Sequence, residues 1–270
     1  MRTLLAASLL ALLAAWPAAA EAPRVQVGTY SMGVEKVARV RDLERPPASQ
    51  NRTALVIFVE AQGAEELKRV VEVCRDPAAV DNTNTRLAFL QVTPASPSAQ
   101  GRKSRRYLEV VFSGTRLGAT QLKQFEGTLV CFASSRACQW QVSAQPGETD
   151  ESAGATLLLD SLGPGQDDAG NDCLLVRLQL EFGPGSGPAS AQEWRGGRLT
   201  LVDGVGNPLA PLSTALQYRY DAAKRLVAIN LTGYFELNEQ SRDAALVRYE
   251  AERLSGLKAL PYRFTNLPLP

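Results

Sequence analysis

Short apolar runs, each followed by turn-forming residues, recur along the chain after the first twenty residues. Apolar and polar residues alternate within several of these runs, as at Cys138, Trp140 and Val142, which is the period of a strand with one buried face. Gly, Pro, Asn and Asp separate the runs at the spacing of sandwich strands. Helical periodicity is slight and predicts single turns near 65–69 and 120–123. The pattern predicts an all-β fold of antiparallel sheets packed face to face.

An internal repeat organises these runs. Residues 40–46 resemble residues 158–164, with an offset of 118 from Asp42 to Asp160, and residues 80–87 resemble residues 202–209 at an offset of 122. The apolar runs that begin at Leu55 and Leu174 are 119 residues apart. Gly127 and Gly233 match at an offset of 106, as do Asp160 and Asn266. The smaller offset implies extra residues in the first copy, which we place between 94 and 106.

The repeat predicts two tandem immunoglobulin-like β-sandwich domains, at residues 21–154 and 155–270. It also bears on residues 243–254, whose pattern fits either a helix or an alternating strand. Their counterpart at 137–148 alternates clearly, so we predict a strand. The repeated Asp-to-Leu turn, the Gly-led strand after it and the closing residues 260–270 resemble uncharacterised secreted bacterial proteins with tandem immunoglobulin-like β-sandwich domains. That resemblance implies the same fold and brings no known activity.

The first twenty residues have the features of a signal peptide. Arg2 precedes an apolar run from residue 4 to residue 15, and three small residues end at Ala20, which is the pattern that signal peptidase requires. We predict cleavage after Ala20, with Ala22 as the alternative, and a secreted or periplasmic protein. No later apolar stretch is long enough for a transmembrane helix.

Charge and composition exclude several functions. The chain has 29 Lys and Arg against 28 Asp and Glu, and removal of Arg2 with the leader leaves 28 of each, so no nucleic-acid partner is expected. It contains no histidine, which removes the usual nucleophile triads and the commonest transition-metal ligand. No phosphate loop or nucleophile elbow is present. We therefore predict a non-enzymatic protein without a cofactor.

Four cysteines remain after processing, an even number in an oxidising compartment. Cys131 and Cys138 bracket a stretch that looks like a turn between two strands, so they are candidates for a local disulfide. Cys74 and Cys173 would then pair across domains or stay reduced.

Two loops are candidate ion sites. Four positive charges precede the strand at Tyr107 and are a candidate site for an anionic glycan, a phosphate or an acidic partner, although the pattern favours a solvated loop; they are Arg102, Lys103, Arg105 and Arg106. An acidic, Gly-rich turn is a weak calcium candidate, because calcium prefers several oxygen ligands on one loop; its residues are Asp167, Asp168, Asn171 and Asp172.

Aromatic residues give one further candidate. Five of them could form a face on which sugars stack, although in sandwiches such side chains more often fill the core; they are Trp140, Trp194, Tyr218, Tyr220 and Tyr234.

The sequence thus favours a non-catalytic binding or structural protein of the cell envelope, whose partner is an envelope protein or a polysaccharide. One alternative is a carbohydrate- or calcium-binding accessory module. The other is a hydrolase that uses carboxylates alone, which requires two acids facing each other across a cleft.

Overall fold

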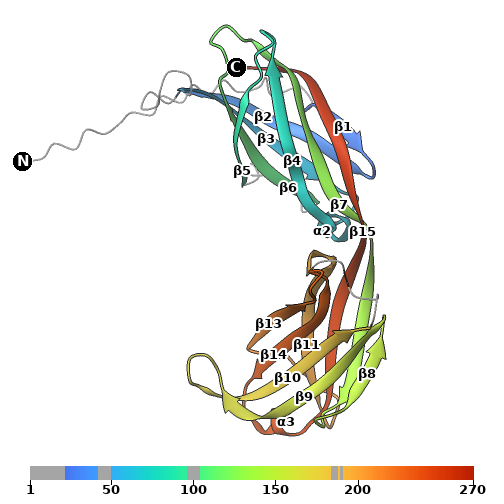
Figure 1. Cartoon of the computed structure of the whole chain (residues 1–270). Coiled ribbons are helices and arrows are strands. Elements are labelled where there is room, and N and C mark those ends of the chain that lie inside the picture. Colours follow the sequence, from blue (N-terminus) through green and yellow to red (C-terminus); the bar gives the residue numbers. More distant parts are fainter. Residues whose placement is uncertain (1–21, 42–49, 96–103, 184–187, 189–190) are drawn as a thin grey trace, which may run out of the picture. The chain divides into compact units, whose positions relative to one another are not determined.

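The structure, a computed structural model, describes residues 22–41, 50–95, 104–183, 188 and 191–270. Its contacts divide the chain into two compact units (Figure 1). The first unit comprises Met1–Ala133 and Leu257–Pro270, and the second comprises Ser134–Gly256. These limits differ from the sequence-based boundary at residues 154 and 155, because the end of the chain belongs to the first unit. The leader predicted at residues 1–20 lies outside the described residues.

Strands make up most of the described chain. In order they are β1 (Arg24–Val27), β2 (Tyr30–Arg41), β3 (Asn51–Glu60), β4 (Val70–Asp81), β5 (Ala88–Pro94), β6 (Arg105–Ser113), β7 (Gln121–Ser143), β8 (Thr149–Ser152), β9 (Ala155–Gln166), β10 (Asp172–Phe182), β11 (Trp194–Asp203), β12 (Pro208–Leu209), β13 (Ser213–Tyr220), β14 (Leu226–Phe235) and β15 (Ala244–Pro268). The described helices are short: α2 (Ala64–Lys68), η1 (Ala191–Glu193) and α3 (Glu239–Arg242). The prediction of an all-β fold is confirmed.

Three antiparallel sheets contain these strands. One has the order β1-β2-β3-β6-β5, and another has the order β8-β9-β10-β14-β13. The third has the order β12-β11-β15-β7-β4, and its long strands β7 and β15 carry residues of both units. The first two sheets therefore share one strand order, in which the strand that carries Leu55, β3, corresponds to the strand that carries Leu174, β10.

Offsets near 120 residues agree with this shared strand order, but the offset of 106 does not. It pairs Gly127, which lies on β7, with Gly233 on β14, although β7 occupies the place of β15 in the order of strands. The same error affects the match between Asp160 on β9 and Asn266 on β15. That part of the sequence-based repeat is wrong. The strand predicted over 243–254 is confirmed, since β15 begins at Ala244.

Four hairpin loops are built in the same way around an aspartate. At Asp81, Asp167, Asp203 and Asp221, the side-chain oxygen Oδ1 accepts a hydrogen bond from the backbone N–H four residues later. The backbone N–H three residues later donates to the carbonyl of the same aspartate, and the residue that bears it has a positive φ. Asp accepts such bonds readily, and the Asn or Gly at the positive-φ position of three loops tolerates the left-handed conformation, which Lys224 adopts in the fourth. Sequence therefore fixes these turns locally.

Each unit buries its own hydrophobic core. In the first unit the core includes Leu55 and Phe112 from one sheet, with Phe125 and Phe264 from the other. In the second unit it includes Val176 and Leu231, again with residues of the facing sheet. The turn predicted near 65–69 is confirmed as α2, whereas the one predicted near 120–123 is wrong, because β7 begins at Gln121.

Candidate functional site

The exposed strand β13 lies at one edge of its sheet. It pairs with β14 and has no other neighbour among the described strands. All eight of its residues are exposed. An edge strand of this kind presents backbone N–H and C=O groups on which another extended chain can pair.

Three apolar side chains form a row on one face of β13. The solvent-exposed fraction is 37% for Leu216, 38% for Tyr218 and 47% for Tyr220. Their partners across the ladder on β14 are core residues, namely Leu231, Ile229 and Leu226. The row therefore continues the core face of the sheet beyond the point at which other side chains cover it. We call these three residues the edge row.

The opposite face of β13 is polar. Gln217 lies opposite Asn230, and Arg219 donates to Glu181 Oε1 over 3.0 Å. This face borders a shallow hollow lined mainly by polar residues of four strands, among them Asp160, Arg177 and Gln217. The strand thus presents an apolar face and a polar face, which is the alternation that an added strand would need to match.

The first unit has an edge strand at the same place in its sheet. It is β5, which ends the order β1-β2-β3-β6-β5 as β13 ends its own sheet. Phe89 and Leu90 on β5 retain 46% and 40% of their exposure, and the Phe89 ring contacts the core residue Phe112 edge to face at 6.1 Å. Exposed apolar side chains at the sheet edge are therefore a feature of both units.

Two of the predicted basic residues make internal contacts in the structure. Arg105 donates to Glu60 Oε2 over 3.0 Å and lies 4.4 Å from the centre of the Phe58 ring. Arg106 donates to the carbonyls of Val70 and Leu67, next to the end of α2. Arg102 and Lys103 lie outside the described residues, so the anion site stays a prediction.

The acidic turn at Asp167 is one of the four aspartate loops. The Asp167 carboxylate accepts hydrogen bonds from the backbone N–H groups of Ala169 and Asn171 and from Asn171 Nδ2. These bonds account for a pKa below the ordinary value of an aspartate, the Asn171 side chain being the largest cause. Asp172 accepts from Gln166 Nε2 over 3.3 Å, and Asp168 makes no such contact in the described part of the chain. Calcium binding at this turn stays a prediction.

The predicted disulfides are absent from the structure, in which all four cysteines are free and buried. Cys131 and Cys138 lie on the same strand, β7, at positions seven residues apart, and an extended strand spans about 23 Å over that distance. Cys131 belongs to the core of the first unit and Cys138 to the core of the second. The stretch between them is strand, not a turn, so a local bridge cannot form.

The predicted aromatic face is divided. Trp140 and Trp194 are buried in the core of the second unit, with ring centres 5.8 Å apart. Tyr218 and Tyr220 belong to the edge row. Apolar and polar residues alternate along β13 in the sequence. Alternation alone does not show whether such a strand lies inside a sheet or at its exposed edge.

No family model, curated protein or solved structure matches the chain. Within the described residues, no helix is long and apolar enough to cross a membrane. The fold alone defines the class of the protein: it is an all-β protein with open antiparallel sheets.

Proposed function

We propose that this chain is a non-catalytic secreted or periplasmic binding protein, which pairs the edge strand β13 with an extended segment of an envelope protein. The observation that carries the proposal is the edge row, an apolar strip on a strand that has no second neighbour among the described strands. A segment added beside β13 gains main-chain hydrogen bonds from the edge. Its alternate side chains gain burial against Leu216, Tyr218 and Tyr220.

The partner segment is defined by this geometry. Side chains of an added strand alternate between the two faces of the sheet, so apolar residues at every second position would cover the edge row. Polar residues between them would lie beside Gln217 and the Arg219–Glu181 ion pair. The preferred partner is thus an extended segment with alternating apolar and polar residues.

We further propose that the two units are copies of one immunoglobulin-like sandwich, exported behind the predicted leader. The shared order of strands and the separate cores support the first part. Chain export is tested by expression with the leader and sequencing of the exported protein, which should begin at Glu21, or at Pro23 if the second cleavage site is used.

Selection of a random peptide library on the mature chain tests the binding function. The selected peptides should alternate apolar and polar residues over a length that matches β13. When a selected peptide binds, the NMR signals of the β13 backbone amides should shift. Leu216→Lys combined with Tyr218→Lys should weaken binding at least tenfold, because it removes the apolar surface that the partner's side chains would cover and places charges there.

Ser213→Lys combined with Ala215→Lys is the matched control, since it adds the same charge to the polar face of the same strand at exposed positions away from Gln217 and Arg219. This control should bind the selected peptides within about twofold of the unmodified chain. Equal binding by the two double variants, or selected peptides without alternation, would show that the edge row is not the binding surface.

A further inference from the structure

The edge strand β13 has the alternating pattern that the proposed function requires of its partner. The residues of the edge row alternate with Ala215, Gln217 and Arg219 on the polar face. The strand is exposed along all eight residues and has no second neighbour among the described strands (Figure 1). A second copy of the chain therefore carries a segment of the required kind.

β13 lacks the features that protect sheet edges from such pairing. Bulges, prolines and charged side chains at an edge all hinder the addition of a strand. β5, which ends the sheet of the first unit, has a register shift between Phe89 and Gln91 and carries Pro94. β13 contains no proline, its ladder with β14 is regular from Ser213 to Arg219, and the edge row bears no charge. Pairing with another chain is thus opposed at β5 and left open at β13.

Symmetry limits how two β13 strands can meet. Homodimers most often have a two-fold axis, and the same surface of both copies then forms the contact. Residues that lie opposite each other in the antiparallel pair have their side chains on the same face of the joined sheet. An axis through Tyr218 places Leu216 opposite the partner's Tyr220 and Tyr218 opposite its own copy. Every residue of the edge row then lies opposite an apolar residue.

The polar face agrees with this axis. An axis through Tyr218 places Gln217 opposite the partner's Arg219, and an amide oxygen can accept from a guanidinium. An axis through Arg219 would place two guanidinium groups opposite each other, and like charges across a ladder destabilise it. Axes through Gln217 or Leu216 would each place a tyrosine of the edge row opposite Thr214. Of these four axes, only the one at Tyr218 matches both faces of the strand.

We propose, on the basis of the function proposed above, that the partner of β13 is a second copy of this chain, paired antiparallel about a two-fold axis at Tyr218. Burial of the two edge rows stabilises the contact, and main-chain hydrogen bonds between the two edges fix its register. Two five-stranded sheets then form one continuous sheet. The contact is confined to one strand of eight residues in each chain, so the dimer is weak and dissociates on dilution.

Sedimentation velocity of the mature chain, from micromolar to millimolar concentration, tests this pairing. The unmodified chain should change from monomer to dimer within that range. Leu216→Lys should weaken dimerisation at least tenfold, because it removes apolar surface and places a charge opposite the partner's Tyr220. Leu90→Lys is the matched control and should leave dimerisation unchanged. Leu90 lies on β5, and its solvent-exposed fraction of 40% is close to the 37% of Leu216.

Substitutions of Gln217 test the register of the pair. Gln217→Glu places a carboxylate opposite the partner's Arg219 and should strengthen dimerisation about threefold, because opposite charges across a ladder attract. Gln217→Lys places a like charge there and should weaken dimerisation at least threefold. When each is combined with Arg219→Gln, the two variants should differ by less than twofold, because the opposing charge is gone.

A chain that stays monomeric at every concentration would overturn the proposal. A dimer that survives Leu216→Lys, or that responds alike to both charges at position 217, would overturn it too. The selected peptides distinguish these results from failure of the proposed function. If the chain stays monomeric while alternating peptides bind β13, the edge serves a different protein and only the second copy is excluded. If neither a second copy nor any peptide binds at β13, the proposed function fails as well.

Discussion

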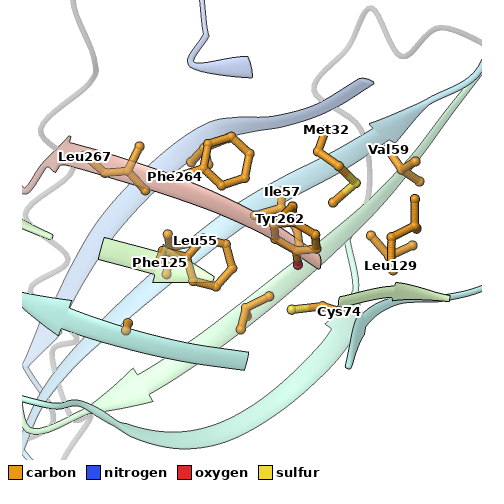
Figure 2. Close-up of a cluster of buried hydrophobic side chains, with 14 of the residues drawn as sticks. Met32, Leu55, Ile57, Val59, Cys74, Phe125, Leu129, Tyr262, Phe264 and Leu267 are labelled. Carbon is orange, nitrogen blue, oxygen red and sulfur yellow. The ribbon is translucent and has the colours of Figure 1, made fainter. Parts of the chain in front are cut away.

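The Tyr262 side chain occupies the space into which any side chain at position 127 would point. A Cβ atom on Gly127 would lie 2.6 Å from the Tyr262 hydroxyl oxygen. This contact buries a hydroxyl whose polar neighbour is the Cys74 thiol (Figure 2), and the geometry of that pair does not meet the criteria of a hydrogen bond. In the second unit Tyr249 also lies against a glycine, Gly197, but its hydroxyl is bonded to Trp194. The hydroxyl groups of Tyr262 and Tyr249 are therefore expected to have opposite effects on the free energy of unfolding.

Removal of the Tyr262 hydroxyl should stabilise the protein. Tyr262→Phe keeps the ring and removes a buried hydroxyl whose polar neighbour, the Cys74 thiol, is only a weak hydrogen-bonding group, so the free energy of unfolding of the first unit should rise by about 1 kcal/mol. Tyr249→Phe should lower that of the second unit by about 1 kcal/mol, because Trp194 Nε1 loses its acceptor. Urea unfolding followed by NMR signals of each unit measures both values. A loss of stability in Tyr262→Phe would mean that its hydroxyl is bonded in solution.

Gly197 is expected to tolerate no side chain. Gly197→Ala places a Cβ 1.9 Å from the Tyr249 ring, and the overpacking should cost about 1–3 kcal/mol of unfolding free energy. Gly118→Ala is the control, because nothing lies within 4 Å of a Cβ at that position. Thermal unfolding of the two variants should show a lowered midpoint for the first and an unchanged midpoint for the second. Equal midpoints would contradict the tight contact between strand and ring.

Local patterns predicted much of this fold. Alternation located the strands, and Asp81 and Asp203 marked two of the four hairpin loops because their hydrogen bonds are made within five residues. The course of β7 could not be predicted in this way. Its residues 133–137 are exposed, where the strand leaves the core of one unit and enters the other, and an exposed polar stretch looks like a turn. Exposure of the edge row also depends on tertiary structure, which alternation does not report.

The ionisation of Asp81 should make the free energy of unfolding depend on pH. Burial alone would raise its pKa, but hydrogen bonds from the Thr83 side chain and from the backbone of Thr85 and Thr83 outweigh burial, and the pKa is lowered. A carboxyl group whose pKa is lower in the folded than in the unfolded protein stabilises the fold at any pH above its unfolded pKa. This stabilisation is lost as the pH falls through the pKa of the folded state.

Asp81→Asn should therefore reduce the unfolding free energy at pH 7 by about 1–2 kcal/mol, and its difference from the unmodified chain should shrink between about pH 5 and about pH 2. Asp168→Asn, on an exposed side chain of another loop, should leave the pH profile of stability unchanged. Urea unfolding across this range supplies the comparison. Parallel profiles for the unmodified chain and Asp81→Asn would show that the Asp81 charge is not favoured by folding.

The four cysteines should be reduced and unreactive in the folded protein. Each thiol is buried, and burial raises the pKa of Cys74 to about 11, so little of the reactive thiolate forms at pH 8. Alkylation followed by intact-mass measurement should show no label on the native chain and four labels after unfolding in urea without a reductant. Reductant should leave the thermal midpoint unchanged, because no covalent loop is opened. Fewer than four labels on the unfolded chain, restored by reductant, would demonstrate a disulfide and contradict the free cysteines of the structure.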